Sequence, residues 1–296
     1  MTDQAASLRE LMQRRQTRLH SQPNAVAAPR AFTIAVTSGK GGVGKSNIAL
    51  NLAVALARHN STVGVFDANL GLGNIDLLCG LNGYWNLSHV ITGARSLNEI
   101  VLTGPEGIHV VPGASGLADV ADCPPAAQRE IFSQLEDFER SHDFVIIDTG
   151  PGIHRAVRDF VLSAGLVLLV TTPEPTALAD AYATVKALAN CDGLRLEILV
   201  NQAASAAQAD AVIQRLQQTA RLFLNADVGS AGSVPHDPCV SAAVQRRHPL
   251  LVDHPDSPAA LAITQLARRM MQLAQNRPST NEFFPKIRQR YLPAAA

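Results

Sequence analysis

Short apolar runs alternate with longer amphipathic segments through most of the chain. The longer segments repeat their apolar residues about every 3.6 positions, as a helix covering one face of a sheet does. Strand alternating with helix indicates β-α-β units with right-handed crossovers. We therefore predict an α/β fold with a doubly wound, mostly parallel sheet flanked by helices. Strands are predicted at residues 31–37, 62–67, 108–112, 143–149, 166–171, 196–201 and 228–234, and helices at 47–58, 177–189, 206–223 and 258–275.

An N-terminal extension precedes this α/β region. Leu8, Leu11 and Met12 are spaced i, i+3, i+4, which predicts a short amphipathic helix. The next ten residues hold two prolines and show no periodicity, as is typical of a linker. A helix on a tether indicates a partner to contact. The predicted division is a helix at 1–20, a linker at 21–30, the α/β domain at 31–275 and a C-terminal tail at 276–296.

The tail carries a second amphipathic segment. Its aromatic and aliphatic side chains fall within an arc of about 100° on a helical wheel, with basic residues at the rim. This pattern suits a helix lying in the interface of an anionic membrane. A tail docked on its own domain fits the same pattern, and the two states can alternate with nucleotide. The apolar residues are Phe283, Phe284, Ile287 and Tyr291, and the basic ones are Lys286, Arg288 and Arg290.

Composition narrows the class of protein. Lys and Arg together number 25, as do Asp and Glu, so no global field draws the chain onto nucleic acid. Hydrophobic residues make up 47% and aromatic residues 4%, which favours aliphatic parallel strands. The four cysteines form no CxxC pair, as expected of free thiols in a reducing cytosol. Without an apolar run of roughly 18 residues or a signal peptide, we expect a soluble cytoplasmic protein.

A glycine-rich loop follows the first predicted strand. Its spacing matches G-x-x-x-x-G-K-[ST], in which backbone N–H groups wrap phosphates. Lys45 then reaches the β and γ oxygens, and Ser46 offers its hydroxyl to Mg²⁺. ATP and Mg²⁺ are the expected ligands. The predicted binding residues of this loop are Gly39, Lys40, Gly41, Gly42, Val43, Gly44, Lys45, Ser46 and Asn47.

Carboxylates close two of the predicted strands. Asp148 ends one of them and is predicted to hold the Mg²⁺ shell together with Ser46. Asp67 ends another and opens a loop predicted to face the γ-phosphate, where it adds a further metal-binding and catalytic carboxylate. Both would lie at the carboxyl edge of the sheet, where doubly wound folds bind their ligands.

Later strands supply candidates for the base site at the same edge. Asn201 follows one strand, and the segment Pro235, His236 and Asp237 follows the last. An asparagine there can read the edge of adenine while the proline segment flanks the ring. A turn residue without a ligand is the alternative interpretation of Asn201.

The loop and both carboxylate segments resemble the MinD/ParA family of SIMIBI-type P-loop ATPases, whose signature is GKGGVGK[ST]. The resemblance implies that Lys40 reaches across a homodimer interface to the partner's ATP, and that Asn201 reads adenine. The family's DxDxGLxNxD and DTxxGI patterns match at Asp67 and Asp148. Asn69 departs from the first pattern, since the family has there an aspartate that positions the attacking water. A slow ATPase is therefore expected.

Within the family, the chain is similar to regulators of flagellar placement. The N-terminal motif DQAxxLR carries this most strongly, with the switch run at 67–81 and the segment PEPTALADAY at 173–182. The resemblance implies that the motif stimulates the GTPase FlhF. It also implies contacts with flagellar C-ring proteins, in some bacteria with a flagellar transcription activator, and reversible membrane association. The motif residues are Asp3, Gln4, Ala5, Leu8 and Arg9.

Three functions remain open on these grounds. The first is an ATP hydrolase whose cycle switches a dimer and its membrane binding. The second is a non-hydrolysing regulator dimerised by ATP, which Asn69 favours. The third is a ParA-type DNA-partition ATPase, which the balanced charge and the N-terminal motif disfavour.

Overall fold

The structure is a computed structural model that describes residues 31–69, 73–113, 120, 122–189, 191, 193–276 and 282–292. The predicted N-terminal helix, its partner-binding motif and the linker lie outside the described residues.

One sheet of eight strands runs through the described part of the chain, in the order β3-β4-β2-β5-β1-β6-β7-β8. All neighbours are parallel except β3, which pairs antiparallel with β4. The predicted α/β class and the doubly wound parallel sheet are thus confirmed. The strands are β1 Phe32–Ser38, β2 Val63–Ala68, β3 Leu102–Thr103, β4 His109–Val111, β5 Phe144–Pro151, β6 Leu166–Thr171, β7 Leu196–Ala203 and β8 Gly229–Pro235.

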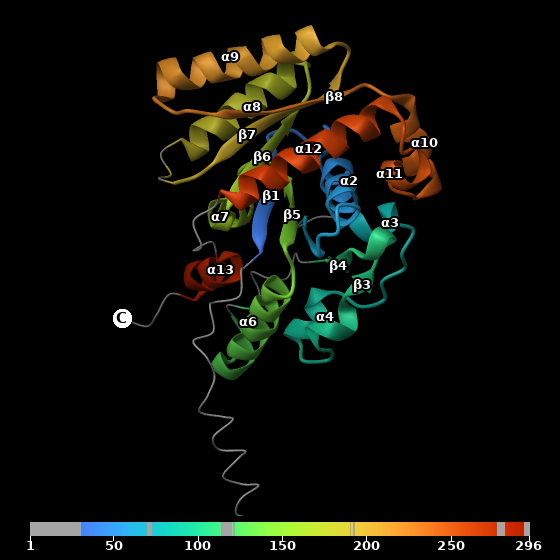
Figure 1. The fold of residues 1–296 in the computed structure, drawn as a ribbon. Helices are drawn as coiled ribbons and strands as arrows, with labels where there is room; N and C mark the ends of the chain where they lie inside the picture. Colours follow the sequence, from blue (N-terminus) through green and yellow to red (C-terminus); the bar gives the residue numbers. More distant parts are fainter. Residues whose placement is uncertain are drawn as a thin grey trace, which may run out of the picture.

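Helices cover both faces of the sheet (Figure 1). Helices α2, α3 and α10 to α12 pack on one face, and α4 to α9 with α13 pack on the other. The helices are α2 Lys45–Ala57, α3 Ile75–Leu78, α4 Leu87–Ile91, α5 Leu97–Ile100, α6 Pro125–Arg140, α7 Arg155–Ser163, α8 Pro175–Leu188, α9 Ala206–Leu224, α10 Pro238–Arg246, α11 Leu250–Asp253, α12 Pro258–Gln275 and α13 Phe283–Tyr291, with a 3₁₀ turn at Pro105–Gly107.

The central strands are buried on both faces, which explains their nearly continuous apolar sequences. In β1, Ile34 and Val36 enter one hydrophobic core while Ala35 enters the other. Helix α2 is buried along most of its length between the sheet and α12. The sheet and α2 therefore hold the ends of β1, β2 and β5 in fixed positions relative to one another.

Helix α13 is docked on the domain. Phe283, Phe284 and Ile287 are fully buried within the core that also holds α6 and α7. The Phe284 ring lies 5.3 Å from that of Phe66 in β2, in an edge-to-face arrangement. The structure thus shows the docked arrangement that the sequence left as an alternative to membrane binding.

A buried carboxylate holds the first turn of this helix. The two carboxylate oxygens of Glu139 accept the backbone N–H groups of Phe283 and Phe284, each at 2.9 Å. Glu139 is 2% exposed. Charged acceptors are stabilising at a helix N-terminus, where the first N–H groups have no partner within the helix. Glu139 therefore fastens the start of α13 to α6.

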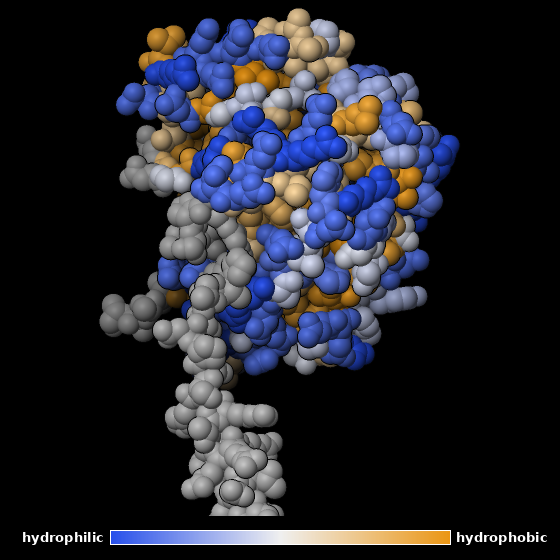
Figure 2. Space-filling model, viewed as in Figure 1, coloured by the Kyte–Doolittle hydropathy of each residue, from blue (hydrophilic) through white to orange (hydrophobic). Residues whose placement is uncertain are grey.

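The surface of the domain is mixed in character. On the face drawn in Figure 2, hydrophobic side chains form small separate groups among hydrophilic ones. None of the described helices is both long and apolar enough to cross a bilayer.

Candidate functional site

The glycine-rich loop joins β1 to the N-terminus of α2. Gly44 begins the helix with a φ of 88°, in the left-handed region that favours glycine. A Cβ at Gly44 would also collide with the amide nitrogen of Asn201. No side chain caps this end of α2, so its first N–H groups are available to an anion. The loop has the geometry of a phosphate cradle.

A buried ion pair lies beneath the loop. The Lys45 Nζ donates to Asp148 Oδ1 at 2.7 Å, and the two side chains are 7% and 1% exposed. Asp148 Oδ2 is buried and has no hydrogen-bond partner among the described residues. An orphaned carboxylate oxygen is costly in a dry site, and a cation or an ordered water would satisfy it. Both residues are ones that the sequence singles out for the phosphate and metal site.

Asp67 lies beside Asp148, in register on the neighbouring strand. Burial raises the pKa of Asp67 to about 6, and the negative charge of Asp148 adds to the effect. Its carboxylate accepts the backbone N–H groups of Asn69 at 3.3 Å and Ile75 at 3.2 Å. Asp67 therefore ties the loop after β2 to the start of α3.

These residues suit a Mg²⁺ ion. Mg²⁺ commonly uses one or two protein carboxylates and completes its shell with phosphate and water. Ser46 and Lys45 line a cavity of about 520 Å³ at the carboxyl ends of β1 and β5, and the orphaned oxygen of Asp148 is a free acceptor nearby. Among the described residues, no three His, Cys, Asp or Glu side chains form a metal-binding group of their own. The phosphates of a nucleotide would have to supply further ligands.

The same cavity contains the residue at which this chain differs from the MinD/ParA pattern. Asn69 lines it together with Asn74 and Arg247, whereas Asp76 is not among the lining residues. Asn69 therefore borders the same cavity as Lys45 and Ser46. Arg247 was not identified from the sequence, because it comes from a turn far from any recognised motif.

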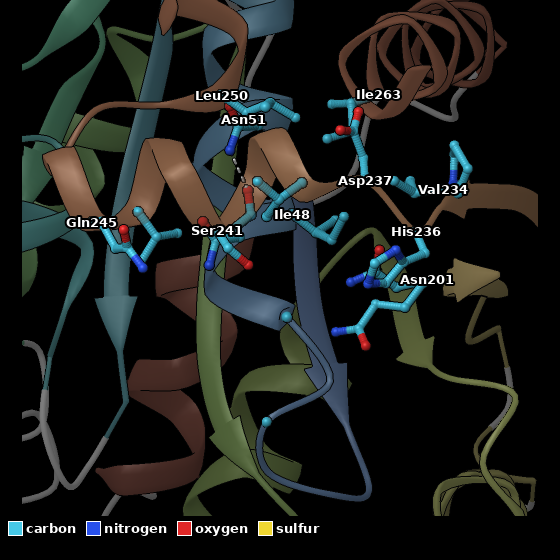
Figure 3. A pocket seen from close by; sticks show the side chains of 17 residues that line it. Ile48, Asn51, Asn201, Val234, His236, Asp237, Ser241, Gln245, Leu250 and Ile263 are labelled. Carbon is cyan, nitrogen blue, oxygen red and sulfur yellow. Dashed lines mark hydrogen bonds between the residues drawn. The ribbon is translucent and has the colours of Figure 1, made fainter. Parts of the chain in front are cut away.

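A second cavity, of about 400 Å³, is drawn in Figure 3. It adjoins the first, because Gly42, Gly44, Asn47 and Val244 line both. The residues that the sequence proposes for the base site, Asn201, Pro235, His236 and Asp237, all line it. In Figure 3, Asn201 and His236 lie close together at one end of the cavity and Gln245 lies at the other. The walls that sequence reasoning missed come from four helices and include Ile48, Asn51, Val240, Ser241, Val244, Leu250 and Ile263.

Two of the residues predicted for the base site, Asn201 and Asp237, also hold the walls of this cavity together. Asn201 Nδ2 donates to the carbonyl of Val43 at 2.8 Å, which joins β7 to the glycine-rich loop. The Asp237 carboxylate accepts the N–H groups of Cys239 at 2.9 Å and Ala259 at 3.1 Å, which joins the starts of α10 and α12. Burial alone would raise the pKa of Asp237, but these hydrogen bonds outweigh it and hold the pKa below its usual value.

Lys40 is turned toward its own chain. Its Nζ lies 2.7 Å from Glu174 Oε2 and 2.9 Å from Thr176 Oγ1, at the start of α8. Both partners belong to the segment 173–182 singled out in the sequence. The Lys40 and Glu174 side chains are substantially exposed, so the pair is weak and exchangeable.

Comparison with known proteins agrees with this geometry. Residues 31–271 match the sequence model of the ParA family, described as NUBPL iron-transfer P-loop NTPase. The Antiactivator FleN of Pseudomonas aeruginosa is 37% identical over 238 residues, covering 80% of this chain and 85% of FleN. The flagellum site-determining protein YlxH of Helicobacter pylori is 34% identical, covering 79% of this chain and 80% of YlxH.

Solved structures share the fold. The MinC:MinD cell division complex of Aquifex aeolicus matches with a TM-score of 0.66 at 24% identity, covering 82% of this chain and 96% of that one. MinD of Pyrococcus horikoshii, solved with Mg-ADP, matches with a TM-score of 0.66 at 24% identity, covering 82% and 97%. The chain therefore belongs to the ParA/MinD family of P-loop NTPases, and FleN and YlxH are among its relatives.

Proposed function

We propose that this protein is an ATPase that dimerises on binding ATP and Mg²⁺ and regulates flagellar number and placement, as a regulator of the FlhG (FleN/YlxH) type. The observation that carries the nucleotide part is the buried pair of Lys45 and Asp148 under an uncapped helix N-terminus. The flagellar part rests on the relatives, which are named as an antiactivator and a flagellum site-determining protein.

In this proposal the loop residues bind and orient the phosphates. The backbone N–H groups at the start of α2 hold the phosphate oxygens, and Lys45 leaves Asp148 to reach the β and γ oxygens. Mg²⁺, held by Ser46 and Asp148 with Asp67 nearby, would neutralise charge on the phosphates. Asn69 orients the attacking water through its amide, without the negative charge of an aspartate.

The second cavity is proposed to hold the adenine ring. Apolar side chains such as Ile48, Val240 and Ile263 line it and suit the faces of a planar base. The Asn201 amide donates one hydrogen to the carbonyl of Val43. Its Oδ1 can therefore accept a hydrogen bond from the exocyclic amino group of adenine.

Steady-state release of phosphate from ATP tests the enzymatic proposal. A measurable rate that disappears on removal of Mg²⁺ supports a hydrolase, whereas dimerisation by ATP without any release of phosphate favours the non-hydrolysing regulator. Salt-dependent binding to nonspecific DNA would instead revive a DNA-partition function.

The N-terminal motif is proposed to act on FlhF. A peptide of residues 1–20 is expected to stimulate GTP hydrolysis by FlhF, because a proline-containing linker separates it from the ATPase domain in the sequence. A peptide carrying Leu8→Glu, which places a charge on the apolar stripe, serves as the control. Unchanged GTP turnover with the unmodified peptide would remove this partner from the proposal.

The tail is proposed to bind the inner face of the cell membrane reversibly, so the cytoplasmic protein would associate with it peripherally. Docking and membrane binding would compete, because they use the same side chains. The apolar face is buried in the core, Arg288 pairs with Glu136 at 2.9 Å, and Arg290 lies 3.7 Å from Asp159. One short helix anchors weakly, so a dimer with two tails would bind with greater avidity.

Loss of the Glu139 carboxylate should release this tail. Glu139→Gln replaces two charge-assisted acceptors at the start of α13, which should shift the docking equilibrium about tenfold or more toward the free tail. We expect this variant to float with vesicles of anionic lipid even in ADP. Asp137→Asn is the matched control. Asp137 lies on α6, as Glu139 does, but its side chain is exposed and pairs with Arg140.

Addition of Phe284→Glu to the Glu139→Gln variant should abolish flotation, because the apolar face would carry a charge. If Glu139→Gln binds vesicles no better than Asp137→Asn, docking does not control the tail. If the double variant still floats, α13 is not the anchor.

A further inference from the structure

Arg247 occupies an unusual backbone position at the edge of the cavity of about 520 Å³ that is lined by Lys45 and Ser46, called the phosphate cavity below. It ends α10 with φ 58° and ψ 41°, in the left-handed region. Helices that end in this way usually place glycine there, because a Cβ makes the conformation unfavourable. The Arg247 N–H donates to the carbonyl of Val244 at 3.0 Å, so the turn itself requires only a backbone. A long cationic side chain at such a position suggests a task for that side chain.

Arg247 borders the space where phosphates would bind. Arg247 lines the cavity that also contains Lys45, Ser46 and Asn69. Its neighbour along α10, Val244, lines both this cavity and the one proposed for the base. One helix therefore borders both halves of the nucleotide site.

The other cations around this site already have partners. Lys45 is held by Asp148, Lys40 by Glu174, and Arg246 lies 2.9 Å from Asp253 on α11. Arg247 has no ion pair or side-chain hydrogen bond within the described part of the chain. Its charge is thus free for an incoming anion.

We propose that Arg247 is a phosphate-contacting residue that binds the phosphate chain of the nucleotide from the turn after α10. A guanidinium suits this role because its fork of N–H donors matches two phosphate oxygens. The contact would draw α10, which also lines the cavity proposed for the base, toward the phosphates. It would so couple the two cavities. This inference rests on the proposed nucleotide-binding function.

A purely structural role gives a different expectation. A cation at a helix C-terminus is stabilised by the helix dipole, so its removal would lower the stability of the fold and leave nucleotide affinity unchanged. Phosphate binding instead predicts a loss of ATP affinity. Under either role, glycine relieves the left-handed backbone and so offsets the lost dipole interaction.

The test compares Arg247→Gly, Arg247→Lys and Arg246→Gln in the full chain. Competition against a fluorescent nucleotide gives the affinity for ATP and ADP, and urea denaturation gives the stability. We expect Arg247→Gly to bind ATP about tenfold more weakly at undiminished stability, and Arg247→Lys to recover part of the loss. Arg246→Gln, which removes a neighbouring charge outside the cavity, should bind as the wild type does.

Unchanged ATP affinity in Arg247→Gly, or an equal loss in Arg246→Gln, would overturn the role of Arg247 while the nucleotide site stands. A wild-type protein that binds neither ATP nor ADP would overturn the proposed function itself, and this inference with it.

Discussion

Lys45→Ala is expected to abolish ATP binding, with an affinity loss of roughly a hundredfold or more. Lys45 is the cation at the base of the loop, and charge-assisted hydrogen bonds to phosphate are among the stronger polar contacts. The change also leaves Asp148 buried without its partner, so the fold should lose stability, by about 3 kcal/mol if the pair behaves as other buried ion pairs do. Isothermal titration below the melting temperature of the variant measures binding separately from unfolding.

Lys40→Ala is the matched comparison, because it removes another lysine from the same loop. Lys40 contacts exposed side chains at the start of α8 and not the buried carboxylates. We expect this variant to retain measurable ATP binding and to lose the ATP-dependent dimer. Equal loss of binding in both variants would contradict a separate, cross-interface role for Lys40.

Asn69→Asp is expected to raise the rate of ATP hydrolysis roughly a hundredfold without tightening ATP binding. An aspartate can accept a hydrogen bond from the attacking water and stabilise developing positive charge, which the amide cannot do. A contribution on the order of 3 kcal/mol corresponds to this change in rate. Binding should stay constant because Lys45, Ser46 and the loop amides hold the phosphates. Single-turnover hydrolysis and ATP affinity, measured on both proteins, provide the comparison.

Asp76 is the carboxylate that could replace the missing one. Its Oδ1 accepts the N–H of Leu77 at 2.9 Å, and the residue does not line the phosphate cavity. Asp76→Asn should therefore leave hydrolysis unchanged. Equal rates for the wild type and the Asn69→Asp variant would remove residue 69 from the mechanism, and brisk turnover by the unmodified chain would rule out the non-hydrolysing regulator.

The parts of the fold that could be predicted are those written in local sequence. Strands buried on both faces have continuous aliphatic runs, so the pattern locates β1, β2 and β5 to β7. Strands β4 and β8 are less buried and give a weaker signal. Strand β3 has only two residues and leaves no periodic signal. The phosphate loop and the carboxylates that end β2 and β5 were predictable because their chemistry requires fixed spacing within one segment.

Other parts of the site depend on contacts between distant segments. The cavity proposed for the base is closed by α2, α10, α11 and α12, whose apolar residues look like ordinary core residues in the sequence. Arg247 lies in a left-handed turn at the end of α10 and lines the phosphate cavity, and no local sequence pattern predicts this position. The position of the C-terminal tail could not be predicted from its local sequence either. Its amphipathic pattern fits both a membrane and a protein surface, and the buried acceptor Glu139 lies far away on α6.

The oligomeric state of the full chain with different nucleotides tests the central claim most directly. Light scattering coupled to size exclusion should report a monomer with Mg-ADP and a dimer with Mg²⁺ and a non-hydrolysable ATP analogue. The Lys40→Ala protein should remain monomeric with both nucleotides. A wild-type chain that keeps one mass with ADP and with the ATP analogue would contradict the account of an ATP-dimerised switch.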